Sequence, residues 1–195
     1  MTMLAAHGYA LTSDALEGVD LVARLRAGHR DAIVEAYEAH HEAIRSFARR
    51  LVGDDASAED LVHDVFVELP RAIGRFRGEA PLRTFLLSIA GNLSRKHVRA
   101  AIRKRRAFGA IAVAPAPSPR TPEHDAEGAE LAAALVRALD ELSDEHRLAF
   151  VLAEVEERSA GEISAIVGAP EATVRTRLFH AKKKLRELLA KGGHR

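Results

Sequence analysis

The chain of 195 residues contains no cysteine and no tryptophan, and aromatic residues make up only 5% of it. Without cysteine there is no disulfide framework, no thiolate metal site and no thiol nucleophile, which indicates a reducing compartment. No apolar run approaches the roughly 18 residues of a membrane span. The first Lys or Arg is Arg24, so the basic start of a secretory signal is missing. We therefore expect a cytoplasmic protein.

The motifs of common enzyme classes are also missing. There is no Gly-rich phosphate loop, no G-x-S-x-G elbow and no HExxH helix. Asp60, His63 and Asp64 would share one helical face, but such short spacing often arises by chance, so a solvated or partner-binding face is favoured over a metal site. We predict a protein that is not an enzyme and has no cofactor, no metal and no small-molecule substrate.

The net charge of +1 conceals a strong segregation of charge along the chain. Between Arg71 and Arg106 there are eleven Lys or Arg and one acid, Glu79, whereas residues 130–157 hold eight acids and two arginines. A basic stripe of this density is typical of a surface that binds a polyanion. Some of these cations could instead interact with the negative end of a helix dipole, but seven Lys or Arg between residues 95 and 106 are more than that interaction requires.

Apolar residues recur at helical spacings, and no convincing strand is found. We predict an all-α protein of two small helical domains joined by a flexible Pro/Ala-rich linker, the C-terminal one containing a helix-turn-helix. The predicted segments are a flexible N-terminal lead (1–18), a first domain (19–106), the linker (107–128), a second domain (129–190) and a tail (191–195). Twenty extended linker residues would reach roughly 60 Å, the length of about 18 base pairs.

Capping residues and prolines predict where the helices begin and end. We expect a helix that Ser57 caps and Pro70 kinks or ends, and a long helix from Pro81 to about Arg106. In the second domain we expect one helix over about 127–142 and another that Ser143 caps and that runs to about Glu157.

Residues 159–189 have the pattern of a helix-turn-helix. Ser159 and Glu162 form a capping box, Gly168 ends the first helix, and Pro170 suits the first position of the second. One face of that second helix is apolar (Val174, Leu178, Ala181, Leu185 and Leu188), and six cations oppose two acids over residues 171–187. The pattern therefore favours a DNA-binding helix over a merely solvated amphipathic one.

Phe76 lies between Arg75 and Arg77 in a predicted loop just before the basic helix. An aromatic ring between two guanidinium groups could receive an unstacked base.

These features together resemble an extracytoplasmic-function sigma factor, a compact promoter-recognition subunit of bacterial RNA polymerase, over about residues 21–189. Three motifs carry the resemblance in the expected order: AEDLVHDVF (58–66), RFRGEAPLRTFLLSIAGNLSRKHVR (75–99) and EISAIVGAPEATVRTRLFHAKKKLRE (162–187). The chain departs from the family where tryptophan is usual, at Phe85 and near Leu69 and Pro70, and in having Gly91 and His180 where basic residues are common.

The resemblance implies a function for each motif. The first would bind the clamp helices of the largest core polymerase subunit through Asp60, Leu61, His63, Asp64 and Phe66. The second would melt and read the minus-ten element through Arg75, Phe76, Arg77, Asn92, Lys96 and Arg99. The third would read the minus-thirty-five element through Arg175, Thr176, Arg177, His180, Lys182 and Lys183. The implied partners are core RNA polymerase, promoter DNA and an anti-sigma factor, often anchored in the inner membrane.

Two other hypotheses remain at this point. The first is an ordinary transcriptional regulator that binds an operator without polymerase. The second is an adaptor that binds polymerase or an anti-sigma factor but does not start transcription, and the missing tryptophans keep it open.

Overall fold

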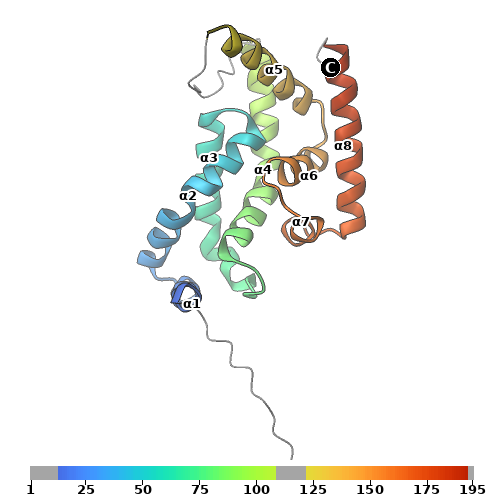
Figure 1. The fold of residues 1–195 in the computed structure, drawn as a ribbon. Coiled ribbons are helices and arrows are strands. Elements are labelled where there is room, and N and C mark those ends of the chain that lie inside the picture. The colour runs from blue at the N-terminus through green and yellow to red at the C-terminus, as the bar shows by residue number, and fades with distance from the viewer. Residues whose placement is uncertain (1–12, 109–121, 193–195) are drawn as a thin grey trace, which may run out of the picture.

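The computed structural model describes residues 13–108 and 122–192, and all regular structure in these ranges is helical (Figure 1). The α-helices are α1 (Ser13–Arg26), α2 (Arg30–Val52), α3 (Asp55–Ala72), α4 (Leu82–Phe108), α5 (Pro122–Asp140), α6 (Asp144–Glu154), α7 (Ala160–Val167) and α8 (Glu171–Lys191). A 3-10 turn, η1 (Ile73–Arg75), follows α3. The predicted all-α class is confirmed.

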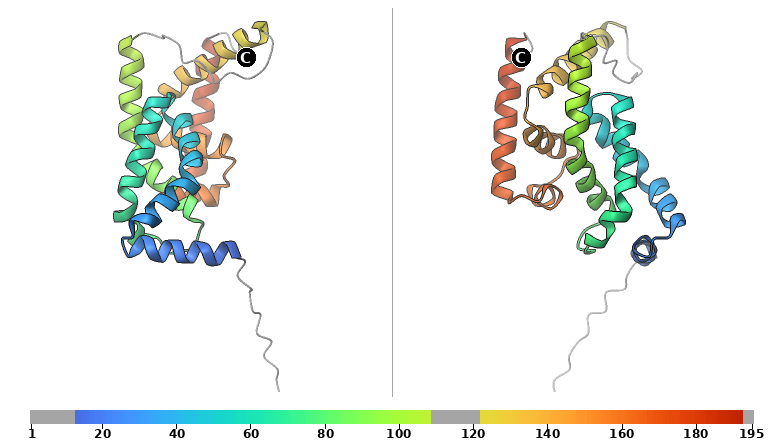
Figure 2. Two further views of the ribbon diagram at one scale, coloured as in Figure 1. Left: turned by 90° about the vertical axis from the view of Figure 1, so that its left-hand side faces the viewer. Right: turned by 180° about the vertical axis from the view of Figure 1, so that it is seen from behind.

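The long helix α4 stands at the centre of the molecule. Helices α2 and α3 pack on one side of it, whereas α6 and α7 contact it on the other side and α8 lies outside them (Figure 1). Helix α1 runs across the base of the upright helices (Figure 2). The two halves of the chain are therefore held side by side by α4.

The core of the first half follows from the helical spacing of its apolar residues. Phe47 and Leu51 of α2, Leu61 and Val65 of α3, and Leu86 of α4 are all essentially inaccessible to solvent. Each pair within one helix is four residues apart, so both side chains lie on the same face. Full burial of such a side chain contributes about 1.5–3 kcal/mol.

The C-terminal half shares this core and also has a smaller apolar cluster of its own. Five of its apolar side chains join the cluster of α2–α4: Val151, Leu152, Ile163, Ile166 and Val174. A Cβ atom at Gly91 of α4 would lie 3.3 Å from Cδ2 of Leu148 in α6, so the missing side chain allows the two helices to approach closely. A smaller cluster joins α5, α6 and α8.

A buried arginine also ties the two halves together. Arg147 of α6 is 2% exposed and donates hydrogen bonds to the carbonyl of Leu51 at 2.8 Å, to the carbonyl of Leu139 at 3.1 Å and to Asp140 Oδ1 at 2.6 Å. The Asp140 carboxylate also accepts two hydrogen bonds from the guanidinium of Arg105 in α4, one at each oxygen. Burial lowers the pKa of Arg147, and the bond to Asp140 opposes that change.

Several helix boundaries differ from the predicted ones. Asp54, not Ser57, caps α3, and its carboxylate accepts the Ser57 N–H at 2.9 Å. Pro70 does not end α3, which continues to Ala72, because the proline lies in the last turn and removes only a hydrogen bond near the helix end. Helix α6 ends at Glu154, three residues earlier than predicted. Pro170 is the N-cap of α8 and not its first residue.

Two helices also begin inside segments predicted to be irregular. Helix α1 starts at Ser13, within the predicted lead, and α5 starts at Pro122, within the predicted linker. Residues 109–121, on which the expected 60 Å reach of the linker depends, lie outside the described residues. Within the described residues, no helix combines the length and the apolar character that crossing a lipid bilayer requires.

Candidate nucleic-acid and polymerase interfaces

The helix-turn-helix is built from local signals in the sequence. Ser159 accepts the Glu162 N–H while the Glu162 carboxylate accepts the Ser159 N–H, which completes the predicted capping box. The hydrogen bonds that the Glu162 carboxylate accepts from the N–H and the hydroxyl of Ser159 lower the pKa of Glu162. Gly168 ends α7 with φ of 64°, in the left-handed region where glycine is favoured. The turn between α7 and α8 is thus defined by its own residues.

Helix α8 presents one buried and one exposed face. Val174, Ala181 and Leu185 are buried, and the opposite side shows a row of exposed side chains: Arg175, Thr176, Phe179, His180 and Lys183. The row begins within the first two turns of α8, the part of a recognition helix that approaches base edges. Its side chains include a guanidinium, a hydroxyl, an imidazole and an ammonium, all of which can bind base edges or phosphates.

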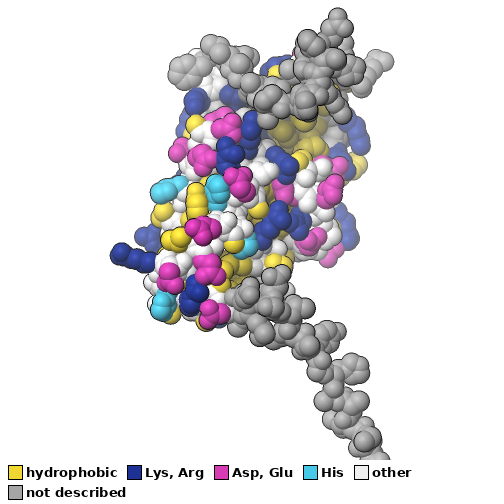
Figure 3. Space-filling view, turned by 60° about the vertical axis from the view of Figure 1, so that its left-hand side comes forward, with side chains coloured by type: hydrophobic (Ala, Val, Ile, Leu, Met, Phe, Trp, Pro, Cys, Tyr) yellow, Lys and Arg dark blue, Asp and Glu magenta, His cyan; other side chains and the backbone are white. Residues whose placement is uncertain are grey.

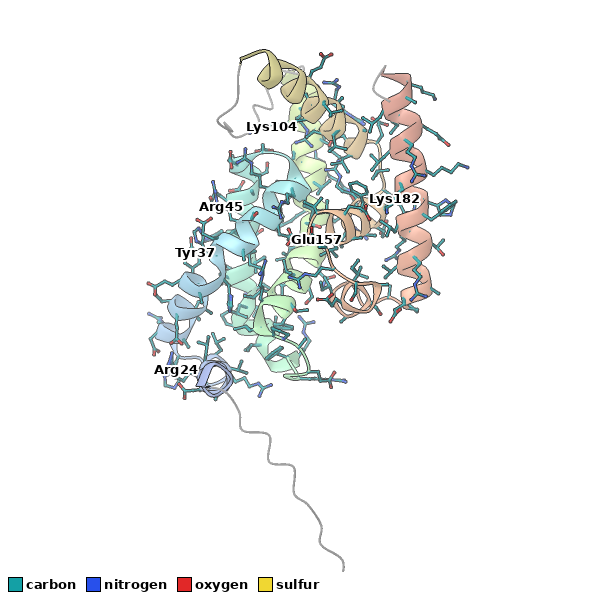
Figure 4. All side chains as sticks on the ribbon, in the orientation of Figure 1. Arg24, Tyr37, Arg45, Lys104, Glu157 and Lys182 are labelled. Carbon is teal, nitrogen blue, oxygen red and sulfur yellow. The ribbon has the colours of Figure 1, made fainter. Side chains whose placement is uncertain are left out.

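Two of the predicted minus-thirty-five residues turn away from this row. Lys182 is half-buried, and its Nζ lies 2.7 Å from the carboxylate of Glu154 in α6 (Figure 4). Arg177 is half-buried and lines a cleft together with Asn92 and Arg95 of α4. The predicted set is therefore split between the outer face of α8 and the side that faces its neighbours.

Within the row, neighbouring groups already hold some side chains in place. Arg175 forms an ion pair with Glu171 at 2.6 Å, one turn earlier, and the Thr176 hydroxyl donates to the Ala172 carbonyl. The His180 ring stacks on His146 of α6, with ring centroids 5.9 Å apart. Burial and the nearby His180 lower the pKa of His146, so its neutral form is favoured.

Phe179 is the residue of this row that the sequence-based selection omitted. It is 64% exposed, and its ring meets the His180 ring edge to face. An exposed aromatic ring beside Arg175 and Thr176 offers an apolar contact of the kind that recognises the methyl group of thymine. Phe179 lies three residues after Thr176 and four before Lys183, and this spacing could have placed it on the same helical face as the predicted residues.

The predicted minus-ten residues of α4 are exposed but largely engaged in ion pairs. Asn92, Lys96 and Arg99 all reach the surface. Lys96 Nζ lies 2.6 Å from Asp64 Oδ2, and Arg99 lies 3.0 Å from Asp144. Arg95, which precedes Lys96, pairs with both Asp144 and Glu145. The positive face of α4 is thus partly neutralised within the chain itself.

The loop before α4 places one of the predicted minus-ten residues in the core. Arg75 and Arg77 are exposed, but Phe76 between them is only 9% exposed and packs against Phe85, with ring centroids 5.1 Å apart. The Phe76 carbonyl also accepts a hydrogen bond from Arg26 of α1. In this arrangement Phe76 belongs to the core, because its apolar ring covers the end of α4, and it does not offer a surface for a base.

The predicted polymerase-binding residues of α3 divide in the same way. Asp60 and His63 are exposed and Asp64 is half-buried, whereas Leu61 and Phe66 are core residues, 0% and 7% exposed. Leu61 and Phe66 therefore shape this face from beneath and do not line it. Hydrogen bonds from Lys96 and His97 hold the pKa of Asp64 below its usual range.

An apolar part of the same face was missed by the sequence reasoning. Tyr37 of α2 is exposed, stacks on His41 at 4.8 Å and meets the Phe66 ring edge-on at 4.9 Å (Figure 4). Val67 of α3 is also exposed. On this side of the molecule, hydrophobic and histidine side chains adjoin one another among acidic ones (Figure 3). Within the described ranges, no group of three or more His, Asp or Glu side chains could hold a metal ion.

Comparison with known families identifies both halves of the chain. The profile of Sigma-70 region 2 matches residues 36–105, from α2 to the last turn of α4. The profile of Sigma-70 region 4 matches residues 132–185, which include the helix-turn-helix. The two matches span most of the described residues and follow the order of the sequence motifs.

Several curated proteins are similar to the chain along most of its length. RNA polymerase sigma factor CarQ of Myxococcus xanthus is 33% identical over 167 residues, which are 85% of this chain and 94% of CarQ. The ECF RNA polymerase sigma-E factor of Escherichia coli K12 is 27% identical over 179 residues, 88% of this chain and 93% of that protein.

Two solved structures share the fold. The sigma factor RpoE of Bartonella quintana, solved with the anti-sigma factor NepR, has a TM-score of 0.57 at 24% identity and covers 80% of this chain and 95% of its own. CnrH, solved with the cytosolic domain of CnrY, has a TM-score of 0.60 at 23% identity and covers 89% of this chain and 97% of its own. The two family profiles and the similarity to CarQ show that this chain belongs to the extracytoplasmic-function sigma factors of bacterial RNA polymerase.

Proposed function

We propose that this chain binds core RNA polymerase and directs it to promoters by two DNA contacts, one from α4 and its preceding loop and one from α8. The observation that carries the proposal is the exposed row on α8, Arg175, Thr176, Phe179, His180 and Lys183, because it belongs to a helix whose other face is buried. Such a row can enter a major groove while the buried face keeps the helix in place.

The polymerase contact is assigned to the shared face of α2 and α3. Exposed Asp60 and His63 supply polar groups, and exposed Tyr37 and Val67 supply apolar area beside them. Aromatic residues with a polar end, such as tyrosine, are enriched at protein interfaces. Leu61 and Phe66 support this face from the core. Clamp helices of the largest polymerase subunit are the partner that the family relationship supports.

The minus-ten contact is assigned to Arg75, Arg77, Asn92, Lys96 and Arg99. All five are exposed, and the arginines and the lysine supply salt-dependent affinity for phosphates while Asn92 can form paired hydrogen bonds with a base. Phe76 is left out of this set because it packs in the core.

Run-off transcription on a library of promoter-like duplexes, with core polymerase and at stated salt, tests the function. Transcripts that select sequence and require this chain are expected. Arg175→Ala should lower them about tenfold, the effect of losing one good base contact. Arg137→Ala, which removes the same charge from an exposed site on α5, should leave them unchanged. Binding to core without transcripts would instead favour an adaptor, and tight DNA binding without core would favour a regulator.

We also propose that an anti-sigma factor restrains this chain. RpoE, which shares its fold, was solved with the anti-sigma factor NepR, and CnrH, which also shares it, was solved with the cytosolic domain of CnrY. A protein that copurifies with the chain should suppress run-off transcripts in one-to-one proportion. A copurifying protein that leaves transcription unchanged at equimolar concentration would argue against this partnership.

A further inference from the structure

Two histidines from different helices meet beside the exposed row of α8. The ring of His146 in α6 stacks on the ring of His180, with centroids 5.9 Å apart and planes inclined by 24°. The Phe179 ring meets His180 edge to face from the neighbouring position. His146 is half-buried, whereas His180 is exposed. The more buried ring therefore fixes the orientation of the ring that can reach DNA.

Cationic side chains surround this pair in a groove between α6 and α8. Besides the two histidines, the groove is lined by Lys183, Lys184, Glu187, Leu188 and Lys191. Glu145 and Arg177 also act on His146, and Glu145 itself pairs with Arg95 of α4. Lys184 is held in place by the carbonyl of Glu141. Among the described residues, no charged side chain of α5 or α7 lines the groove, so its balance is positive.

These surroundings disfavour a proton on the pair in the free chain. Burial and the His180 ring lower the pKa of His146, as do the cations Arg177 and Lys184, whereas Glu145 opposes them. Two adjoining imidazoles repel each other when both are charged, so the pair takes up one proton before the other. Because a charge is better solvated on an exposed group, the first proton is held by His180.

The phosphates of DNA act in the opposite direction. A major-groove contact of α8 brings phosphates close to the lysines of the groove, and negative charge favours the charged form of a nearby imidazole. An imidazolium donates from both ring nitrogens, so it suits acceptors such as guanine N7 and O6 or a phosphate oxygen. Binding that is coupled to proton uptake strengthens as the pH falls.

We infer that His146 is a positioning residue for His180, and that His180 binds the minus-thirty-five DNA as an imidazolium, so that promoter affinity is linked to pH. The inference rests on the proposed function of α8. In contrast to Arg175 and Lys183 of the same row, His180 then supplies a positive charge that depends on the pH of the cell.

The affinity of the holoenzyme for a promoter duplex selected by run-off transcription tests the proton link. From about pH 8 to about pH 6, at constant ionic strength, the affinity should rise about tenfold, the effect of a change of one pKa unit on binding. His180→Gln keeps a polar side chain that does not titrate, and it should lose this rise. His29→Gln removes an exposed histidine between α1 and α2 and should keep it. An equal rise in the two variants would overturn the inference.

Variants of His146 test the positioning role. His146→Ala removes the stacked ring and should lower the preference for the selected minus-thirty-five base pairs several-fold. His146→Phe restores a ring that does not titrate, and it should recover both this preference and the pH-dependent rise, because the proton is held by His180. Full sequence preference in His146→Ala, or no recovery in His146→Phe, would contradict the positioning role. His180 is exposed, so His180→Gln is a valid test whatever the stability of the His146 variants.

Modified DNA identifies the acceptor that His180 binds. Replacing guanines of the element with 7-deazaguanine removes N7, and a methylphosphonate removes the charge of a single phosphate. The substitution that abolishes the pH-dependent rise marks either a base edge or the backbone as the acceptor. A rise that survives every substitution along the element would contradict a direct contact.

Arg175→Ala separates failure of this inference from failure of the proposed function. If Arg175→Ala weakens promoter binding while His180→Gln keeps the full pH-dependent rise, α8 binds the DNA and only the proton link is wrong. If neither variant changes promoter binding at any pH, α8 is not the minus-thirty-five contact and the inference falls with that assignment.

Discussion

Replacing Arg147 should be among the most destabilising single changes in this chain. The guanidinium is buried, and it donates to two main-chain carbonyls and to Asp140. Truncation to alanine leaves the carbonyls of Leu51 and Leu139 without this donor, and these belong to different helices. Breaking one side of a buried, hydrogen-bonded ion pair costs about 3–5 kcal/mol.

The interactions of Asp140, the partner of Arg147, determine how much of this loss of about 3–5 kcal/mol the Arg147→Ala variant should show. Asp140 keeps two hydrogen bonds from Arg105 after the change, so its charge stays paired. The Leu139 carbonyl also keeps a hydrogen bond from the Leu142 N–H. The loss therefore comes mainly from the unpaired Leu51 carbonyl and from the cavity, and we expect about 3 kcal/mol, the lower end of the range.

Urea unfolding followed by far-UV circular dichroism measures this loss. Arg106→Ala is the matched control, because it removes an arginine whose ion pair with Glu141 is exposed, and it should cost less than about 1 kcal/mol. A loss at Arg147→Ala as small as that of the control would refute the reasoning, since it would mean that the buried hydrogen bonds contribute nothing net.

Other residues give independent predictions. The free energy of unfolding should fall as the pH drops below about 6.5, because His40 and His146 have lowered pKa values in the folded state and the unfolded chain takes up more protons. Urea titrations across pH should show a flatter profile for His40→Gln with His146→Gln, and an unchanged profile would contradict this. Ser159→Ala should lower stability by about 1 kcal/mol in the same assay, through loss of the α7 cap. Phe179→Ala should leave the urea midpoint nearly unchanged, since the ring is exposed, but lower run-off transcription several-fold, and equal transcription would exclude it from DNA contact.

Features encoded within a few neighbouring residues were predictable from the sequence. The capping box of Ser159 and Glu162 and the stop at Gly168 form as expected because each involves residues three or four positions apart. The start of α3 was misplaced since residues 54–57 contain several capping side chains, and only the backbone geometry selects Asp54.

Features that depend on packing between distant segments were not predictable in this way. Leu61, Phe66 and Phe76 were assigned to binding faces, but they belong to the core that several helices share. The pattern of a helix shows which residues share a face, but not which partner helix that face meets. The same limit applies to Arg147, whose hydrogen bond to Leu51 spans 96 residues, and to the ion pairs that Asp140 and Asp144 form with α4.

Gly91 lies where the two sigma regions touch, so a side chain at this position would change the distance between α4 and α6. Alanine there would favour the helical conformation of α4 by about 0.5–1 kcal/mol, yet its methyl group would press on Leu148 at 3.3 Å. Larger residues must displace Leu148 or push α6 away from α4. Side-chain volume at this position should therefore act as a graded control of how often the two regions come apart, from glycine upward, without altering any side chain that we assign to the proposed DNA or polymerase contacts.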